Sequence, residues 1–283
     1  MNRAAAEALI RAELPRKAEE LCRLLRESAS VKARTAVDST IPVGQSKFGG
    51  WPDVDTEFNW PCVDGRPLAF LLQLNCRDIR LVAPDLPVPP QGVISVFYDI
   101  ENQPWGFDPK DGQSKCVRFI RSIESLRRCP PNNAPSPLVV PSAKISLDAA
   151  LDFPGAWEEP ALEGLDLSEQ EFDKIDELRN RIAGSGEGGH QLFGYPWIIQ
   201  NSMQEECQLA SSGVFVGEPE GYESEAGKNL LTGASDWLVW LQVDSDDKLK
   251  LMWGDVGRIY FWIRKQDLAA SRFDRSWLIL QCT

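Results

Sequence analysis

The sequence predicts an α+β protein, made mainly of antiparallel β-sheets in two pseudo-repeated halves with peripheral helices. Short apolar runs of strand length are separated by turns rich in Gly and Pro. One helix-forming segment opens the chain and another lies near its middle. Several landmarks also occur twice in the same order, which indicates two similar halves.

Residues 1–30 are predicted to form an N-terminal helical segment. Alanines between residues 5 and 12 have high helix propensity, and Leu14, Leu21 and Leu25 recur at helical spacing. Pro15 fits the first turn of a second helix, so it splits the segment in two. The rest of the chain, 31–283, is expected to form a single domain.

The strands are predicted where apolar residues run for four to seven positions between turn residues. The expected strands cover 68–74, 93–98 and 117–120 in the first half, and 237–243, 258–263 and 277–281 in the second. Residues 265–270 fit one or two helical turns.

A helical insert, about residues 122–189, is expected to join the halves. Ser168 and Glu171 have the spacing of a capping box, in which each side chain bonds a free amide at the helix start. Ile175, Leu178 and Ile182 follow at helical spacing.

The repeat is predicted to span about 45–121 and 190–283. Its landmarks share an order and, in most cases, an offset. The matching pairs are Gly50-Trp51-Pro52 with Gly194-Tyr195-Pro196, Gln73 with Gln242, Gly92 with Gly257, and Phe107-Asp108 with Phe273-Asp274. Two similar halves imply a seam between them.

Strand alternation predicts a candidate binding surface on the second half. Val239, Leu241 and Val243 are assigned to the core, so the intervening side chains face the other way. That opposite face is predicted to gather Trp240, Gln242, Asp244, Arg258, Tyr260 and Trp262. Flat aromatics with a few polar groups suit a ligand or partner surface. In the alternative, a helix covers this face and its polar groups bond internally.

Composition limits the classes of partner. The net charge of −12, without a dense Lys/Arg run, disfavours nucleic acid and leaves a basic protein as a plausible partner. No long apolar run or secretory signal is found, so the sequence predicts no membrane association. The seven cysteines include no Cys-x-x-Cys pair, which favours reduced thiols and a cytoplasmic location.

Motifs spaced along residues 45–283 resemble a known bacterial family. They include Lys47-Phe48-Gly49-Gly50-x-Pro52, Trp60-Pro61, Leu71-Leu72-Gln73-Leu74-Asn75-Cys76, Trp105-Gly106-Phe107-Asp108, the segment 190–196, Met203-Gln204-x-Glu206-Cys207-Gln208-Leu209 and Trp253-Gly254-Asp255-x-Gly257. Together these resemble the YwqG family, a family of unknown function. The resemblance implies an α+β fold and supplies no active site.

Candidate catalytic and metal groups are few. His190 is the only histidine, and no Gly-x-Ser-x-Gly elbow accompanies it, so we assign no catalytic residue and place His190 among the binding residues. The acidic run Asp244-Ser245-Asp246-Asp247 lacks the Gly and distal Glu of a calcium loop, and a solvated turn explains it. We therefore expect neither a metal nor a cofactor.

These observations favour a non-enzymatic binding protein that uses the predicted surface or the seam. One concrete version is an immunity-type protein that neutralises a basic toxin domain, steered by the acidic charge. The rival is an enzyme of unrecognised class near the seam. Convergence of His190, Glu206 and Asp255 in one pocket would favour the enzyme, and their dispersal would favour binding.

Overall fold

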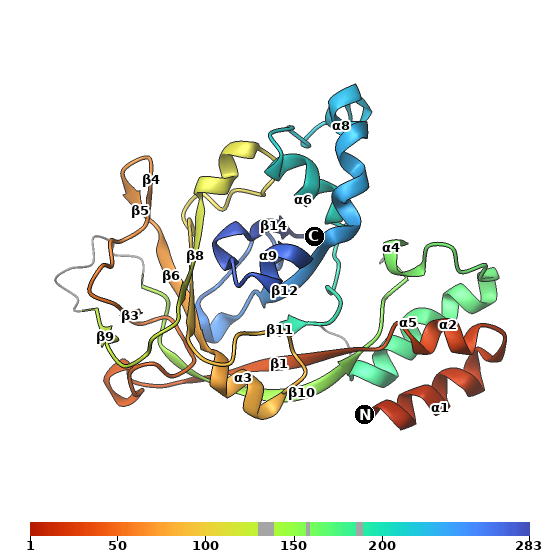
Figure 1. Ribbon diagram of the computed structural model, residues 1–283, viewed down its shortest axis with the longest axis horizontal. Helices are drawn as coiled ribbons and strands as arrows, with labels where there is room; N and C mark the ends of the chain where they lie inside the picture. Colours follow the sequence, from red (N-terminus) through yellow and green to blue (C-terminus); the bar gives the residue numbers. More distant parts are fainter. Residues whose placement is uncertain (130–138, 157–158, 185–188) are drawn as a thin grey trace.

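The computed structural model describes residues 1–129, 139–156, 159–184 and 189–283 (Figure 1). Part of the expected insert, at 130–138, 157–158 and 185–188, lies outside the described residues. Within the described residues, an antiparallel ten-stranded sheet dominates the fold and has the strand order β14-β13-β12-β11-β1-β10-β2-β6-β7-β8. The fold is therefore α+β, as predicted.

The strands of this sheet are β1 (Arg26–Thr35), β2 (Lys47–Phe48), β6 (Ala69–Asn75), β7 (Val93–Tyr98), β8 (Lys115–Ile120), β10 (Ala143–Asp152), β11 (His190–Phe193), β12 (Trp237–Asp244), β13 (Arg258–Arg264) and β14 (Trp277–Gln281). Two small ribbons pair β3 (Asp53–Val54) with β9 (Arg127–Arg128) and β4 (Cys62–Val63) with β5 (Arg66–Pro67). All six strands predicted from apolar runs are present, with ends shifted by at most two residues.

The sheet curls into a nearly closed, barrel-like form. The backbone N–H of Leu280 on β14 donates to the carbonyl of Trp105, which lies in the connection before β8. The Trp277 indole N–H also donates to the Gly106 carbonyl, at 2.9 Å. Chain from the first half thus shields part of the β14 edge, where unpaired backbone groups would otherwise be exposed.

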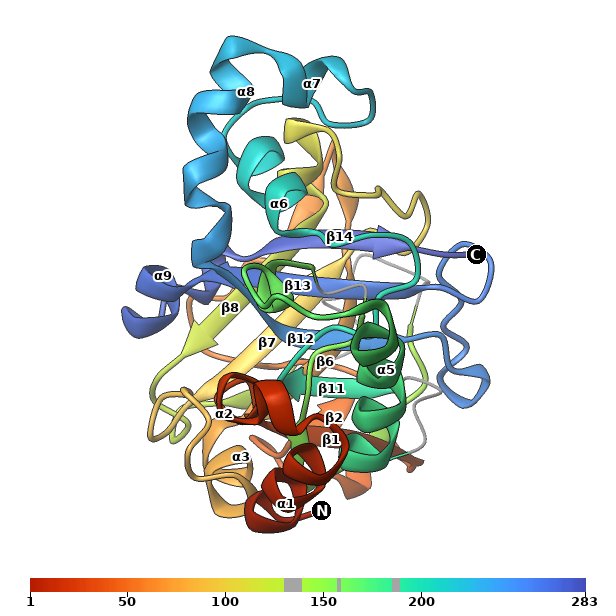
Figure 2. The same cartoon turned by 90° about the vertical axis from the view of Figure 1, so that its right-hand side faces the viewer.

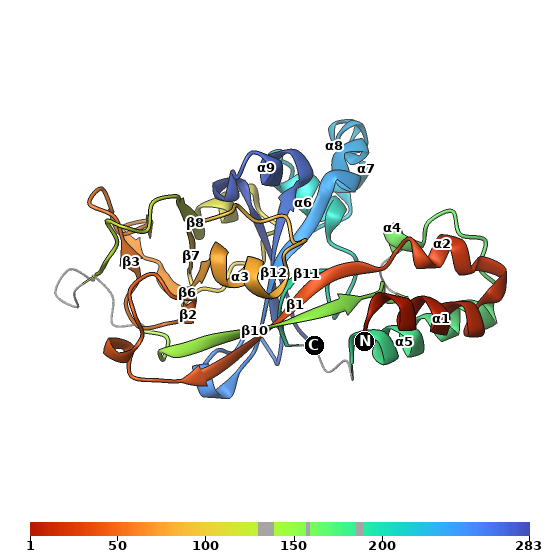
Figure 3. The same cartoon turned by 60° about the horizontal axis from the view of Figure 1, so that its bottom comes forward.

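The centre of the sheet is the long pair β1–β10, which Figure 3 shows crossing the molecule. Ten residues of each strand pair without a break, from Arg26↔Asp152 to Thr35↔Ala143. This pair corrects two predictions. The N-terminal segment is helical only to Cys22, and the expected helical insert contains the strand β10. Apolar Ile145 and Leu147 alternate with polar residues there, which is a strand pattern.

The predicted helices are confirmed in the remaining segments. Pro15 separates α1 (Arg3–Glu13) from the short turn η1 (Pro15–Lys17) and α2 (Ala18–Cys22). The capping box of Ser168 and Glu171 begins α5 (Glu169–Ala183). These helices pack on one another in a lobe at one end of the molecule, together with Leu151 and Phe153 (Figure 1); in Figure 2 this lobe faces the viewer.

Other helices flank the sheet. They are α3 (Cys76–Val82), α4 (Glu159–Leu162), α6 (Gln204–Ser211), α7 (Glu220–Glu223), α8 (Glu225–Leu230) and α9 (Lys265–Ala269), with 3₁₀ turns η2 (Asp38–Thr40), η3 (Pro109–Gln113), η5 (Leu231–Asp236), η6 (Asp247–Leu249) and η7 (Phe273–Arg275). The helix α9 confirms the predicted turns at 265–270.

A β-bulge changes the predicted faces of both β6 and β12. The register shifts between Phe70 and Leu72 on β6, and between Val239 and Leu241 on β12. A bulge adds one residue, so the alternation reverses on its two sides. Trp240 therefore joins Leu241 in the interior cluster, whereas Val239 joins Trp262 in the cluster beneath α6.

Two buried glutamines close the turns beside these strands. The Gln73 carbonyl oxygen accepts from the Asp53 N–H at 2.9 Å, and its amide donates to the Gln45 carbonyl at 2.8 Å. Gln242 accepts from the Trp197 N–H at 2.9 Å and donates to the Gly189 carbonyl at 2.7 Å. Each glutamine thus satisfies backbone groups that have no strand partner.

Replacing Gln73 by Ala is expected to lower the free energy of unfolding by about 3 kcal/mol, because buried backbone groups lose their partners. Ser95, which lies opposite Gln73 on β7, provides a matched control. Its hydroxyl is buried without a partner among the described residues, so Ser95→Ala should be neutral or slightly stabilising. Urea denaturation measures both variants, and equal losses would contradict the assigned role of Gln73.

Candidate binding cleft

Most of the surface predicted from strand alternation is covered. Tyr260 donates its hydroxyl to the Trp197 carbonyl at 2.6 Å, and Arg258 donates to the same carbonyl at 2.8 Å. Trp262 packs beneath α6 and is 1% exposed. The alternative is therefore correct in that the polar groups of Gln242, Arg258 and Tyr260 bond internally, but their partners Gly189 and Trp197 lie in connections and the helix α6 packs on Trp262.

Trp240 does not belong to this face, which corrects the predicted grouping. It is buried in the interior cluster, where its ring contacts Phe261 and Phe273. Its indole N–H donates to the Ser276 hydroxyl at 3.0 Å. A large ring with its polar atom satisfied is the pattern of a packing residue.

His190 and the acidic run form a bonded turn. The His190 Nδ1 accepts from the Asp244 N–H at 3.0 Å, which leaves the proton of the neutral ring on Nε2, 3.4 Å from the Asp246 carboxylate. Burial lowers the pKa of His190, although Asp246 and Asp244 oppose this shift. The Asp244 carboxylate pairs with Arg258 at 3.0 Å, and Asp246 caps η6. In the described residues, no group of three His, Cys, Asp or Glu side chains is placed to hold a metal ion.

Glu206 on α6 is a buried acid. One carboxylate oxygen accepts from Asn201 at 2.7 Å, and the other has no partner among the described residues. Burial raises the pKa of Glu206 to about 7. Asp255, by contrast, is exposed, and the polar contacts of His190 are with Asp244 and Asp246. The three residues of the proposed enzyme site therefore have separate surroundings.

A cleft of about 590 Å³ opens where β11 ends and β12 begins. We call it the β11–β12 cleft. Its lining is mostly apolar and includes Leu86, Phe193, Pro196, Trp237, Leu238 and Trp262. The strand β1 contributes Arg26 and Glu27, and the connection after α3 contributes residues 85–87. The helix α4 contributes Pro160 and Ala161, so the lining comes from segments far apart in the chain.

The backbone at Phe193 adopts a left-handed conformation, with φ of +56°. A bulky residue rarely takes this conformation, which costs about 1 kcal/mol or more. In the first half, Gly49 occupies the position before Gly50 that Phe193 occupies before Gly194, and its φ is +49°. A Cβ at Gly49 would meet the Val140 carbonyl at 2.1 Å, whereas Phe193 lines the cleft.

The charged residues that line the cleft differ in whether they form a salt bridge. Glu27 pairs with Arg3 at 3.1 Å, so it is neutralised at the surface. The Arg26 guanidinium lies 4.0 Å from the Tyr195 ring centre. Lys265 donates to the Ser235 carbonyl at 2.8 Å. Among the described residues, neither cation forms a salt bridge, and Asp85 is the remaining acidic group of the lining.

Sequence reasoning identified only Trp262 of the cleft residues. The other lining residues come from segments far apart in the chain, and no spacing rule connects them. One signal in the sequence points to the cleft. When Gly49-Gly50 is aligned with Phe193-Gly194, the aromatic Phe193 stands where the earlier segment has Gly49.

The chain matches a known protein family. A family model described as "Domain of unknown function (DUF1963)" matches residues 46–282. No curated protein matches the chain. In the part of the chain that the structure describes, no helix is both long and apolar enough to cross a membrane.

The raised pKa of Glu206 predicts that the free energy of unfolding depends on pH. The folded protein holds the proton more tightly than the unfolded chain, because the pKa rises from 4.5 to about 7 on folding. Stability is therefore full below pH 4.5 and falls as pH rises to about 7. Glu206→Gln removes this loss, so it should unfold with a free energy about 3 kcal/mol above wild type at pH 8 and nearly equal at pH 4.

Thermal unfolding at both pH values measures this difference. The control Glu205→Gln removes a neighbouring carboxylate that is exposed, and its effect should be small at both pH values. A wild type that gains stability relative to Glu206→Gln between pH 4 and pH 8 would show that Glu206 is stabilised as a carboxylate.

Proposed function

Because the chain belongs to the DUF1963 family, whose function is unknown, we propose from its geometry that it is a binding protein. We propose that the β11–β12 cleft takes a small, largely apolar molecule. The observation that carries this proposal is the cleft itself, which has a volume of about 590 Å³ and a mostly apolar lining. Small-molecule sites are concave, apolar and of this size.

The separate surroundings of His190, Glu206 and Asp255 favour binding over catalysis. Both ring nitrogens of His190 are engaged inside a turn, because Nδ1 accepts from the Asp244 N–H and Nε2 lies 3.4 Å from the Asp246 carboxylate. A general base must reach the proton that it removes. His190 is not among the residues that line the cleft, so it is not placed to act on a molecule bound there. Of the predicted binding residues, we retain Trp262 as the one that lines the cleft.

We further infer that the protein is a YwqG-like member of its family, built by internal duplication. Gln73 and Gln242 make matching bonds, and both long strands carry a bulge at the matching position. At Gly50 and Gly194, a Cβ would meet the carboxylates of Asp38 and Asp152 respectively. The described residues include all seven cysteines and contain no disulfide, which supports a reducing, cytoplasmic location.

The neutral dye N-phenyl-1-naphthylamine, which fluoresces in apolar surroundings, tests the cleft. Wild type should bind it saturably, and Ala161→Trp should bind it at least about tenfold more weakly, because the new ring fills the cleft from α4. Ala226→Trp adds the same ring at an exposed position on α8 and serves as the control. Equal binding by both variants, or no saturable binding by wild type, would refute the cleft as the site.

A second candidate is an immunity-type protein that binds a basic toxin domain. The acidic tip, defined as residues 215–225 around α7 and the start of α8, projects from the molecule (Figure 2). Its exposed acidic residues are Glu218, Glu220, Glu223 and Glu225, and the same segment carries Phe215, which is 48% exposed. A segment with an exposed ring and four exposed carboxylates fits a basic partner, and the net charge of −12 would steer that partner toward the protein.

An octalysine peptide in 20 mM salt tests the acidic tip. Neutralising three tip residues (Glu220→Gln, Glu223→Gln and Glu225→Gln) should weaken peptide binding at least about fivefold more than a matched change on α5 (Glu169→Gln, Asp173→Asn and Glu177→Gln). Both sets are exposed and change the net charge equally. Equal weakening would show that the peptide senses net charge alone, and would count against this candidate.

A further inference from the structure

Trp262 carries a buried hydrogen-bond donor that the protein itself does not use. Its side chain is 1% exposed and lines the β11–β12 cleft. Its indole N–H has no partner among the described residues. The two neighbouring tryptophans of the same cluster differ, because Trp237 donates to Gln208 and Trp277 donates to Gly106, each at 2.9 Å. Buried indole donors are normally satisfied, so this donor suits an acceptor brought by a ligand.

The shape of the lining favours a flat occupant. Three of the lining residues, Trp262, Trp237 and Phe193, are aromatic, and Leu86 and Leu238 add apolar surface. Phe193 reaches this position only through a left-handed backbone, with φ of +56°. Strain of this kind is retained where the surrounding structure imposes it, and such positions cluster at ligand sites. Aromatic walls interact best with another flat ring, by stacking or edge contacts.

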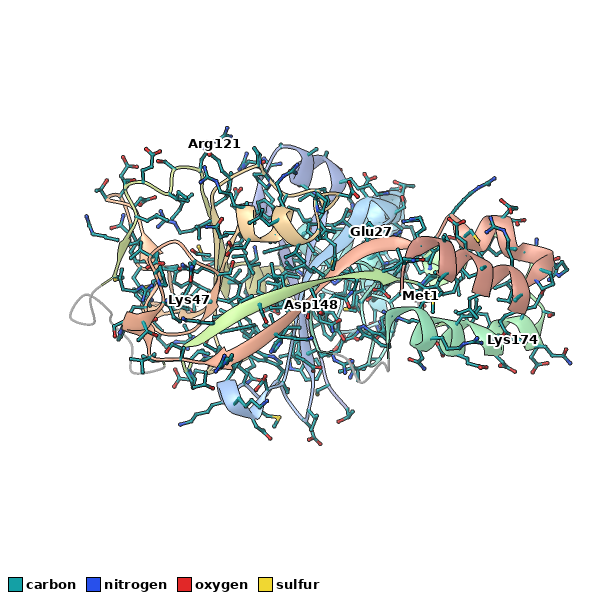
Figure 4. The ribbon with its side chains drawn as sticks, turned by 90° about the horizontal axis from the view of Figure 1, so that it is seen from below. Met1, Glu27, Lys47, Arg121, Asp148 and Lys174 are labelled. Carbon is teal, nitrogen blue, oxygen red and sulfur yellow. The ribbon has the colours of Figure 1, made fainter. Side chains whose placement is uncertain are left out.

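The charges favour an anion. Arg26 and Lys265 line the cleft without a salt bridge among the described residues, whereas the Glu27 carboxylate already pairs with Arg3. Asp85 is the one lining carboxylate without a described ion pair, so the local balance is positive in a chain whose net charge is −12. Arg26 is the first residue of β1, next to Glu27, which Figure 4 labels at the end of the β1–β10 ribbon nearest the helical lobe.

We infer that the β11–β12 cleft binds a planar aromatic acid, whose ring lies among Phe193, Trp237 and Trp262 and whose carboxylate accepts from the Trp262 indole N–H and faces Arg26. This inference rests on the proposed function and names its ligand class. A carboxylate supplies both the acceptor that Trp262 lacks and the counter-charge for Arg26.

Displacement of N-phenyl-1-naphthylamine by three ligands of one ring system tests the inference. The ligands are 2-naphthoate, which is anionic, 2-naphthamide, which is a neutral acceptor, and 2-naphthylmethylammonium, which is cationic. Wild type should bind 2-naphthoate at least about tenfold more tightly than the cation, with the amide between them. Equal affinity for all three would overturn the inference while leaving dye binding in the cleft, and so the proposed function, intact.

Two variants separate the roles of the donor and the cation. Trp262→Phe keeps a ring but removes the N–H, so 2-naphthoate should bind about tenfold more weakly while dye binding changes little. Without ligand, Trp262→Phe loses no internal hydrogen bond, because the donor has no partner among the described residues. Its melting temperature should therefore stay close to that of the wild type. Arg26→Gln should reduce the preference for 2-naphthoate over 2-naphthamide.

Trp253 provides the matched control. It is also 1% exposed with an unpartnered indole N–H, but it lies in the interior cluster and does not line the cleft. Trp253→Phe should leave 2-naphthoate affinity unchanged. Equal affinity of wild type and Trp262→Phe for 2-naphthoate would overturn the inference. If Ala161→Trp binds the dye and all three naphthyl ligands as tightly as wild type, the proposed function is overturned instead.

Discussion

The pairing of β1 with β10 is the constraint on which the rest of the structure depends. On its outer sides, β1 pairs with β11 and β10 pairs with β2. Each strand therefore bonds to chain from the other part of the sequence, and neither set of strands completes its sheet alone. The paired residues are far apart in the chain, so the chain loses conformational entropy in closing these loops before the contacts can stabilise the fold. The sheet is expected to fold as one unit for that reason.

Buried charges hold the turns that this arrangement requires. Lys47 on β2 is fully buried and donates to Asp38 at 2.6 Å, and Arg128 on β9 pairs with both Asp38 and Asp53. Burial lowers the pKa of Lys47, and Asp38 opposes that shift. Two cations and two carboxylates balance, so the cost of burying each charge is offset by its partners. Figure 4 shows Lys47 near one end of the β1–β10 ribbon and the helical lobe that carries Lys174 at the other end.

Against these satisfied networks, the unsatisfied groups stand out. Glu206 and Trp262 are both buried, and each has a polar atom without a described partner. Trp262 lines the cleft, and α6, which carries Glu206, contributes Gln204 to the same lining. Stability alone does not explain such groups, because an unpaired buried polar atom costs free energy. Binding of an external molecule gives at least the indole donor a role.

The sequence by itself determined the α+β class, the strands with strong apolar runs, the split at Pro15 and the capping box of α5, because each depends on local periodicity or local hydrogen bonding. It did not reveal β1 and β10, whose modest apolar patterns were assigned to neighbouring helical segments. Only the tertiary structure decided that Trp240 and Trp262 face opposite ways, because a bulge reverses alternation without leaving a clear sequence signal. It also decided the cleft, since Arg26, Leu86, Phe193 and Trp262 become neighbours only through the long-range pairing of the sheet.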